Sequence, residues 1–259
     1  MPQSTIYRAD RSDGSSRNPH PAVATYGLAR LFGGVPALVD VSMRIEPGRT
    51  VALLGANGAG KTTLLRLLAT AIRPRFGRVE IDGVDAVAQA PVLRAGIAYL
   101  SHAPGLYDGL TLGENLEFAA RLRGLEDGVA RDRVSAAVER VGLAAFASER
   151  VAGFSAGMRR RAALARVLIA RPRLILLDEP YAALDETGLK LVDGLLAEWH
   201  GEGATCVVAS HATERLTELA DATAYLEAGQ LAGLEGEGVT RTTAAPARTP
   251  SPQTAGRAS

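Results

Sequence analysis

The sequence predicts an α/β fold built around a mostly parallel β-sheet, with a helical insertion in its middle. Short apolar runs of buried-strand type alternate with segments whose apolar residues recur every three or four positions, which is typical of a parallel sheet covered by helices. Between about 105 and 150 this alternation gives way to two amphipathic helical segments, and these indicate the insertion. The 259 residues are enough for one large domain.

Strands and helices are expected in the following order along the chain. Strands are expected at about 23–30, 41–46, 50–54, 78–82, 97–100, 174–178 and 205–210, with a final hairpin over 223–233. Helices are expected from Lys61 onward, in the insertion, and over 158–170, 186–200 and 213–220.

Both ends of the chain are predicted to lie outside the folded domain. Residues 1–22 form a polar leader, and residues 236–259 form a tail with a Pro, Thr and Ala bias. Neither has apolar periodicity, so neither is expected to offset the entropy lost on ordering. The folded domain is predicted over 23–235, with its helical subdomain over about 103–165.

The composition argues against several classes of function. The 29 basic and 28 acidic residues give a formal charge of +1, which is too small an excess for a protein held on nucleic acid mainly by charge. No run reaches the roughly 18 apolar residues that a membrane span needs. The single cysteine, Cys206, has apolar neighbours and is predicted to be a buried thiol. We therefore expect no nucleic-acid partner and no direct membrane insertion.

A phosphate-binding loop is the most specific motif of the first half. Residues 55–62, GANGAGKT, fit the pattern G-x-x-x-x-G-K-[ST] between a buried strand and a helix, which is the context that the pattern requires. Its glycines let successive N–H groups point at phosphate oxygens, and the helix adds the positive end of its dipole. Lys61, one of only two lysines, is expected to reach the phosphates, and Thr62 to ligate Mg²⁺. The predicted nucleotide contacts are Gly55, Ala56, Asn57, Gly58, Ala59, Gly60, Lys61, Thr62 and Thr63.

Two adjacent acids end the hydrophobic run LILLDE. Strand ends are where α/β sheets place ligands, and successive strand residues point to opposite sides. Asp178 is therefore expected to face Mg²⁺, and Glu179 to orient a water toward the γ-phosphate. Taken alone, such a pair is also compatible with a solvated turn, but its combination with a phosphate loop favours the catalytic interpretation.

The chain resembles the ATP-binding subunits of ABC transporters over roughly residues 23–235. Residues 154–158, FSAGM, are similar to the LSGGQ signature of that family, and an alanine-rich basic helix follows them as in the family. The resemblance implies a P-loop NTPase of ABC type, with an antiparallel β subdomain beside the parallel core sheet. It also implies an ATPase that uses ATP and Mg²⁺, and a homodimer docked on a separate transmembrane permease subunit. Such a protein would lie peripherally on the cytoplasmic face of the inner membrane.

Further site residues follow from the resemblance. Ser155 and Gly157 would form an anion site that closes on the ATP of the other subunit. Phe32 matches the aromatic residue that stacks on adenine, although a core phenylalanine is an alternative. Asp185 matches the D-loop, and His211 matches the switch histidine, which joins Glu179 and Lys61 in the catalytic set. The triplet at 159–161, RRR, is compatible with an electrostatic anchor, but an exposed helix face is favoured.

The chain departs from the family pattern at three positions. His102 stands where the family has a metal-sensing glutamine, so the predicted metal ligands are Thr62, Asp178 and His102. Met158 and Ala182 are the other two departures. His102 is followed by an x-Pro-Gly-Leu run, the signature reads S-A-G, and the strand end reads DEPYAALD. This combination is similar to the ATP-binding subunit of the cytochrome c biogenesis haem exporter, which suggests haem export. The alternatives are a generic drug or lipid exporter ATPase, a non-transport ABC ATPase, and a module that binds ATP without hydrolysing it.

Overall fold

The computed structural model describes residues 20–211 and 213–242, and these residues form two six-stranded sheets. The larger part of the chain surrounds a sheet with the order β11-β10-β4-β9-β8-β7. All neighbouring pairs in it are parallel except β10 with β11, so the predicted mostly parallel core sheet is confirmed. Its strands are β4 (Thr50–Leu54), β7 (Ile97–Leu100), β8 (Leu174–Asp178), β9 (Thr205–Ala209), β10 (Ala222–Glu227) and β11 (Gln230–Gly236).

The second sheet is antiparallel and corresponds to the predicted β subdomain. Its order is β12-β3-β1-β5-β6, and β2 pairs with β1. Its strands are β1 (Val23–Phe32), β2 (Val35–Val41), β3 (Met43–Ile45), β5 (Phe76–Ile81), β6 (Val84–Asp85) and β12 (Val239–Arg241).

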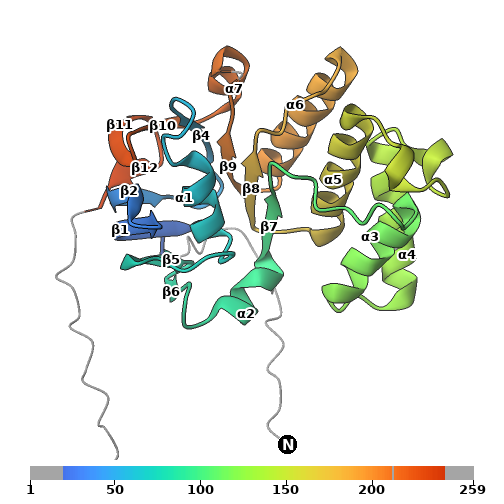
Figure 1. Cartoon of the computed structure of the whole chain (residues 1–259), viewed down its shortest axis with the longest axis horizontal. Helices are drawn as coiled ribbons and strands as arrows, with labels where there is room; N and C mark the ends of the chain where they lie inside the picture. Colours follow the sequence, from blue (N-terminus) through green and yellow to red (C-terminus); the bar gives the residue numbers. More distant parts are fainter. Residues whose placement is uncertain (1–19, 212, 243–259) are drawn as a thin grey trace, which may run out of the picture.

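Helix α1 (Lys61–Leu68) lies between the two sheets (Figure 1). Its buried residues Leu64, Leu65 and Leu68 belong to one hydrophobic cluster that also contains Met43 of the antiparallel sheet and Val51 of the parallel one. The burial of this helix on two sides fixes the phosphate loop at its N-terminus against both sheets. The remaining short helices are α2 (Ala90–Leu93) and α7 (Thr213–Leu219).

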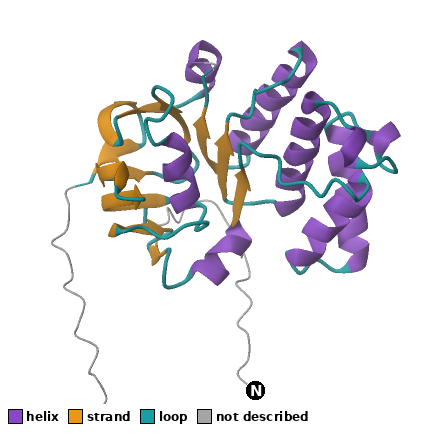
Figure 2. Cartoon of the chain, viewed as in Figure 1, coloured by secondary structure: helices purple, strands orange, loops and turns teal. Residues whose placement is uncertain are grey.

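The predicted helical insertion is confirmed and forms the side of the molecule away from the antiparallel sheet (Figure 2). Helix α3 begins with a capping box in which Thr111 and Glu114 satisfy each other's backbone N–H groups. A second hydrophobic cluster joins these helices to the other face of the parallel sheet. The helices are α3 (Leu112–Leu122), α4 (Asp127–Arg140), α5 (Ala156–Ala170) and, next to them, α6 (Glu186–Gly201).

Two predictions about the chain's elements need correction. The strand predicted at about 41–46 is β3, and a second strand, β2, precedes it from Val35 and also pairs with β1. The tail predicted from residue 236 begins with a strand, because Val239–Arg241 pair with Met43–Ile45. Of the predicted leader, residues 1–19 lie outside the described part, as does the tail beyond residue 242.

Cys206 is buried in β9, as predicted, and burial raises the pKa of its thiol to about 12. Among the helices that the structure describes, none is long and apolar enough to cross a membrane.

Candidate nucleotide-binding site

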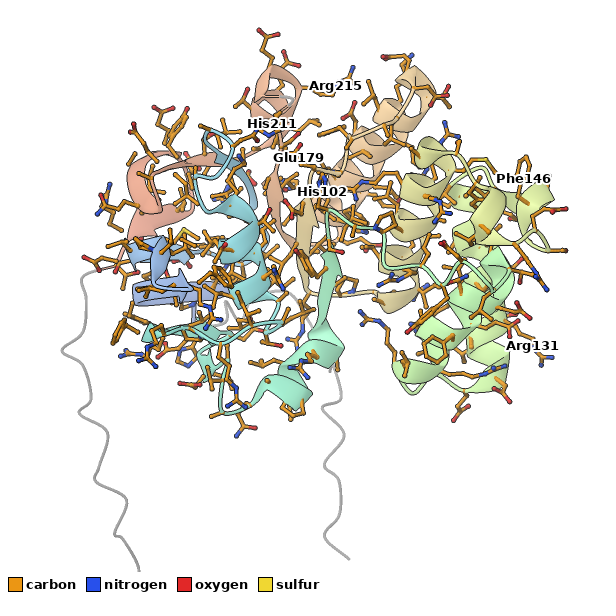
Figure 3. All side chains as sticks on the ribbon, viewed as in Figure 1. His102, Arg131, Phe146, Glu179, His211 and Arg215 are labelled. Atoms are coloured by element: carbon orange, nitrogen blue, oxygen red, sulfur yellow. The ribbon has the colours of Figure 1, made fainter. Side chains whose placement is uncertain are left out.

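A cavity of about 560 Å³ opens at the carboxyl ends of β4 and β8. Strand ends of a parallel sheet are where α/β proteins bind ligands. Figure 3 shows His102, Glu179 and His211 gathered near the middle of the molecule, where three separate segments of the chain meet. The lining residues are Ala37, Asn57, Gly58, Ala59, Gly60, Lys61, Thr62, Thr63, His102, Asp178, Glu179, Ala182 and His211.

The phosphate loop depends on two glycines that no other residue can replace without displacing backbone. Gly55 has φ 148°, and a Cβ there would lie 2.2 Å from the carbonyl oxygen of Leu226. Gly60 has φ 102°, and its Cβ would lie 2.6 Å from the carbonyl oxygen of Ala37. The loop therefore presses directly on β10 at one end and on β2 at the other, and its curvature is fixed by both sheets.

Lys61 places a buried ammonium group within this loop. Its Nζ donates hydrogen bonds to the carbonyl oxygens of Gly55, at 2.6 Å, and Ala56, at 3.1 Å. The residue is only 7% exposed, so its charge is largely removed from water. A cation held beneath inward-facing backbone N–H groups is the arrangement that binds the phosphates of a nucleotide.

Thr62 and Asp178 supply the oxygen donors that fit a divalent cation. The Thr62 hydroxyl donates to Asp178 Oδ1 at 3.1 Å, and Asp178 Oδ2 is buried without a hydrogen-bond partner. A buried carboxylate oxygen with no protein partner calls for a ligand. Mg²⁺ prefers one or two such oxygens together with phosphate oxygens and water.

Glu179 is fixed between the ends of β8 and β9. Its backbone N–H donates to the carbonyl oxygen of Ala209, and its φ of 53° is in the left-handed region, which is costly for a residue with a side chain. The backbone N–H of His211 donates to Glu179 Oε2 at 3.1 Å, and His211 Nε2 lies 3.4 Å from Oε1. The strained backbone thus directs the carboxylate toward His211 at the edge of the cavity.

The arginine triplet at 159–161 is not the exposed helix face that the sequence suggested. Arg160 is 3% exposed, and its guanidinium donates to the backbone carbonyls of four residues around the cavity. Arg159 pairs with Asp108, and Arg161 pairs with Asp185. The predicted exposed face is therefore wrong for Arg160. The sequence gives no sign of which of three consecutive arginines is buried, because that depends on packing against distant segments.

The signature residues lie outside the cavity. Ser155 is exposed and caps α5, because its hydroxyl accepts a hydrogen bond from the Met158 N–H at 3.2 Å. Gly157, in the first turn of α5, approaches the next loop so closely that a Cβ would lie 2.9 Å from the carbonyl oxygen of Ala183. The first residues of this helix, where N–H groups have no carbonyl partner within the helix, therefore lie outside the cavity that the phosphate loop lines.

Asp185 caps the next helix, α6, and connects it to the signature helix. Its Oδ1 accepts a hydrogen bond from the Gly188 N–H at 2.9 Å and also contacts Arg161 Nη2 at 2.5 Å. These two interactions, the backbone bond first, hold the pKa of the Asp185 carboxyl below its usual range. The predicted D-loop residue Asp185 therefore links the first turn of α6 to Arg161 of α5.

A series of hydrogen bonds runs from Tyr181, the residue after Pro180, to α7. Tyr181 is buried and donates through its hydroxyl to Asp193 on α6 at 3.0 Å. Asp193 accepts from Arg215 on α7 at 2.6 Å. Burial, followed by the Asp193 carboxylate, raises the pKa of the Tyr181 phenol. These hydrogen bonds connect the loop after Glu179 to the helix that follows His211, and no motif in the sequence predicted them.

The structure brings most of the predicted site residues together and leaves some apart. Phe32 is exposed at the end of β1 with the guanidinium of Arg30 4.8 Å from its ring centroid, and it does not line the cavity. Ala37 lines the cavity without having been predicted. The predicted residues in the lining are Asn57, Gly58, Ala59, Gly60, Lys61, Thr62, Thr63, His102, Asp178, Glu179 and His211, and those outside it are Phe32, Gly55, Ala56, Ser155, Gly157 and Asp185.

A parallel sheet that presents a phosphate loop and strand-end carboxylates along one edge is the architecture of P-loop nucleoside triphosphatases, and the fold and the site place the chain in this class. Residues 38–182 match the family described as ABC transporter. The chain belongs to this family, as an ATP-binding subunit that hydrolyses ATP and uses Mg²⁺.

Known proteins of the family align with most of the chain. The ABC transporter ATP-binding protein NatA of Bacillus subtilis is 38% identical over 198 residues, which are 76% of this chain and 80% of NatA. The cytochrome c biogenesis ATP-binding export protein CcmA of Bordetella bronchiseptica is 43% identical over 189 residues, 73% of this chain and 82% of CcmA. A dimeric post-hydrolysis structure of the cassette MJ0796 with ADP and Pi superposes with a TM-score of 0.77 at 25% identity, covering 83% of this chain and 98% of that one.

Proposed function

We propose that this ATPase works as a homodimer docked on a separate transmembrane permease subunit, at the cytoplasmic face of the inner membrane, and that it powers export. The observation that carries the dimer is the separation of the two anion sites. The phosphate loop lines the cavity, whereas Ser155 and Gly157 lie outside it at the start of another helix. A second copy of the chain would bring its own signature helix to the ATP held by the first.

The polar and charged side chains named below have the following roles in the proposed reaction. Lys61 binds the β- and γ-phosphates, and the loop N–H groups complete their cradle. Thr62 and Asp178 would hold Mg²⁺, which would neutralise charge on the phosphates. Glu179 accepts the proton of the attacking water, or polarises it, and His211 contacts the γ-phosphate. His102 lines the same cavity and takes the place of the third metal-facing residue.

The contacts of Glu179 support its role as the base. Its side chain is 16% exposed and lines the cavity together with Asp178 and His211. A base must lie within reach of the water that it activates, and geometry is the first requirement. The strained backbone of Glu179 serves this purpose, since it directs the carboxylate out of the strand.

For the cargo we propose haem, exported for cytochrome c biogenesis. The support is the similarity to CcmA at 43% identity, together with His102 and the Pro104-Gly105 pair that follows it. Similarity to NatA at 38% identity makes another ABC cargo the competing assignment. Haem itself would contact the permease, so nothing in this cavity is expected to bind it.

The substitution Glu179→Gln tests the catalytic assignment. The amide keeps the size of the carboxylate but cannot accept the proton, so we expect ATP binding to remain and turnover to fall by about 10²-fold or more. Turnover of ATP and ATP-dependent dimerisation, followed by size-exclusion chromatography with light scattering, are the measurements. Hydrolysis at the wild-type rate would remove Glu179 from the proposed mechanism.

The cargo is tested separately in cells. Deleting the gene should abolish covalent haem in c-type cytochromes, as detected by haem staining of membrane proteins, and a plasmid copy should restore it. A Glu179→Gln copy should fail to restore it. Normal c-type cytochromes in the deletion strain would exclude haem as the cargo and leave the ATPase assignment intact.

A further inference from the structure

Arg160 joins three separate segments of the chain around the catalytic cavity. It lies in the second turn of α5, is 3% exposed, and points away from the exposed start of that helix. Its Nη1 donates to the backbone carbonyl of Ser101, at 2.9 Å, and to that of His102, at 3.4 Å. Its Nη2 donates to the backbone carbonyls of Asp178 and Glu179.

These four carbonyls form two pairs, and each pair flanks one site residue. The carbonyls of Asp178 and Glu179 lie on either side of the Glu179 Cα, so binding both restricts φ and ψ of Glu179. The carbonyls of Ser101 and His102 do the same for His102. One guanidinium therefore fixes the backbone from which both side chains enter the cavity.

Fixing the backbone matters most at Glu179. Its φ of 53° is unfavourable for a residue with a side chain, and such a conformation persists only where the surroundings hold it. The Ala209 carbonyl binds the Glu179 N–H, and Arg160 binds the carbonyls on both sides. Without Arg160, two carbonyls at the end of β8 would lose a charged donor, and the residue would be free to relax toward an ordinary conformation.

Only arginine has the shape for this task. Its planar guanidinium carries donors on two separate nitrogens, which here serve two strand ends. The compact ammonium of lysine cannot span both pairs with fixed geometry, and glutamine has a single amide nitrogen. Burial lowers the pKa of Arg160, whereas the neighbouring Asp178 and Glu179 carboxylates oppose this, and an arginine stays charged throughout.

We propose that Arg160 is a positioning residue for ATP hydrolysis, which sets the direction of Glu179 and His102 through their backbone carbonyls. The inference rests on the proposed catalytic role of Glu179. Arg160 does not line the cavity, and its hydrogen bonds within the described residues go to backbone carbonyls outside the phosphate loop, so we expect its contribution to fall on the chemical step and to leave ATP binding unchanged.

The test compares Arg160→Gln, Arg160→Lys and Arg160→Ala with the full-length wild type in steady-state ATPase assays. We expect kcat to fall at least about tenfold in Arg160→Gln and Arg160→Ala, and less in Arg160→Lys, with KM for ATP within about twofold, because small misplacement of a reacting group is costly. Guanidinium ion at low millimolar concentration should partly restore kcat in Arg160→Ala by occupying the vacated site. Loss of stability alone would lower the apparent kcat only in proportion to the unfolded fraction, so kcat is referred to the folded protein in each sample, and it would give no rescue by guanidinium.

Arg166 provides the matched control on the same helix. It donates to the carbonyls of Pro104, at 2.8 Å, and Gly105, at 2.5 Å, so it anchors the same loop a few residues further on without reaching the end of β8. We expect Arg166→Ala to keep kcat within about twofold and to show no response to guanidinium. An equal loss of kcat in Arg166→Ala would overturn the inference, because anchoring of the loop would then explain both variants.

The folding of each variant and the turnover of Glu179→Gln are measured in the same series of experiments. Circular dichroism and binding of a fluorescent ATP analogue identify folded variants, and Arg160→Lys, which keeps the charge, serves if Arg160→Ala does not fold. Wild-type kcat in Arg160→Lys and Arg160→Gln would overturn the inference while Glu179→Gln remains inactive. Full turnover in Glu179→Gln would instead overturn the proposed role of Glu179, and with it the reason for positioning it.

Discussion

The phosphate loop and the start of α5 both lie at the N-terminus of a helix, but they differ in what surrounds them. At the phosphate loop, Lys61 is 7% exposed, the Thr62 hydroxyl meets Asp178, and two glycines rest on the backbone of both sheets. At the start of α5, Ser155 is exposed and its hydroxyl caps its own helix.

This difference separates a site that is complete from one that is half of a site. The first has the Lys61 ammonium, the Thr62–Asp178 pair and Glu179 around one cavity. The second has helix N–H groups and a hydroxyl, and neither Ser155 nor Gly157 lines that cavity. Because we propose that a second copy of the chain completes this half-site, we expect substitutions to have different effects in the two regions.

Removing the cation of the complete site has the largest expected effect. Lys61→Ala takes away the buried ammonium that binds phosphate, and we expect ATPase activity to fall by about 10²-fold or more, with a comparable loss of ATP affinity. Lys190→Ala is the matched control, since Lys190 is 74% exposed and only 3.9 Å from Glu186 in a surface pair. Binding of a fluorescent ATP analogue and phosphate release measure both variants, and equal effects of the two substitutions would contradict the assignment.

Mixing two inactive variants tests whether the half-site works across a dimer. Ser155→Asp keeps a good helix cap but places a negative charge where the partner's phosphate would lie, so we expect it to be folded and inactive. In an equal mixture with Lys61→Ala, random pairing gives one intact composite site in half of the dimers, and about a quarter of wild-type activity should return.

The ATPase rate of the mixture, measured against each variant alone, decides this point. If the mixture stays as inactive as its components while both proteins still dimerise with each other, then the two regions do not meet across an interface. A mixture of Lys61→Ala with Glu179→Gln provides the reference, because both lie at the same complete site and should not complement in this way.

The smallest expected effect concerns the cap of α5 itself. Ser155→Ala removes the acceptor of the Met158 N–H, and loss of such a cap costs about 1 kcal/mol. For a chain of this size we expect the melting temperature to fall by about 2–4 °C in differential scanning calorimetry. Ser155→Asp should restore most of it, so the stability and the activity of residue 155 can be separated.

Local patterns predicted much of this fold. The alternation of strands and helices, the buried run before Lys61 and the amphipathic segments of the insertion all report on neighbours in sequence, and these elements were found where expected. Strand β2 was partly missed because Pro36 and the Gly33-Gly34 pair before it indicate a turn, whereas its partner is 10-residue β1. Strand β12 was missed because it follows two glycines and leads into a Pro-rich end, and only its pairing with β3 makes it a strand.

The site divides in the same way between local and long-range information. The phosphate loop could be predicted because its chemistry is contained in eight consecutive residues. The buried state of Arg160 could not, since it depends on four carbonyls that lie 18 to 59 positions away in sequence. The hydrogen bonds from Tyr181 through Asp193 to Arg215 were missed for the same reason, because their partners lie 12 and 22 positions apart in sequence.

The buried position of Cys206 makes this chain a convenient carrier for single-site labelling. It is the only cysteine of the 259 residues, and with a pKa of about 12 almost none of it is thiolate at neutral pH. A maleimide dye or spin label would therefore attach only at a cysteine introduced on the surface. In the proposed homodimer, labels near the start of α5 on both copies would report the distance between the subunits before and after ATP hydrolysis, by energy transfer or dipolar spectroscopy.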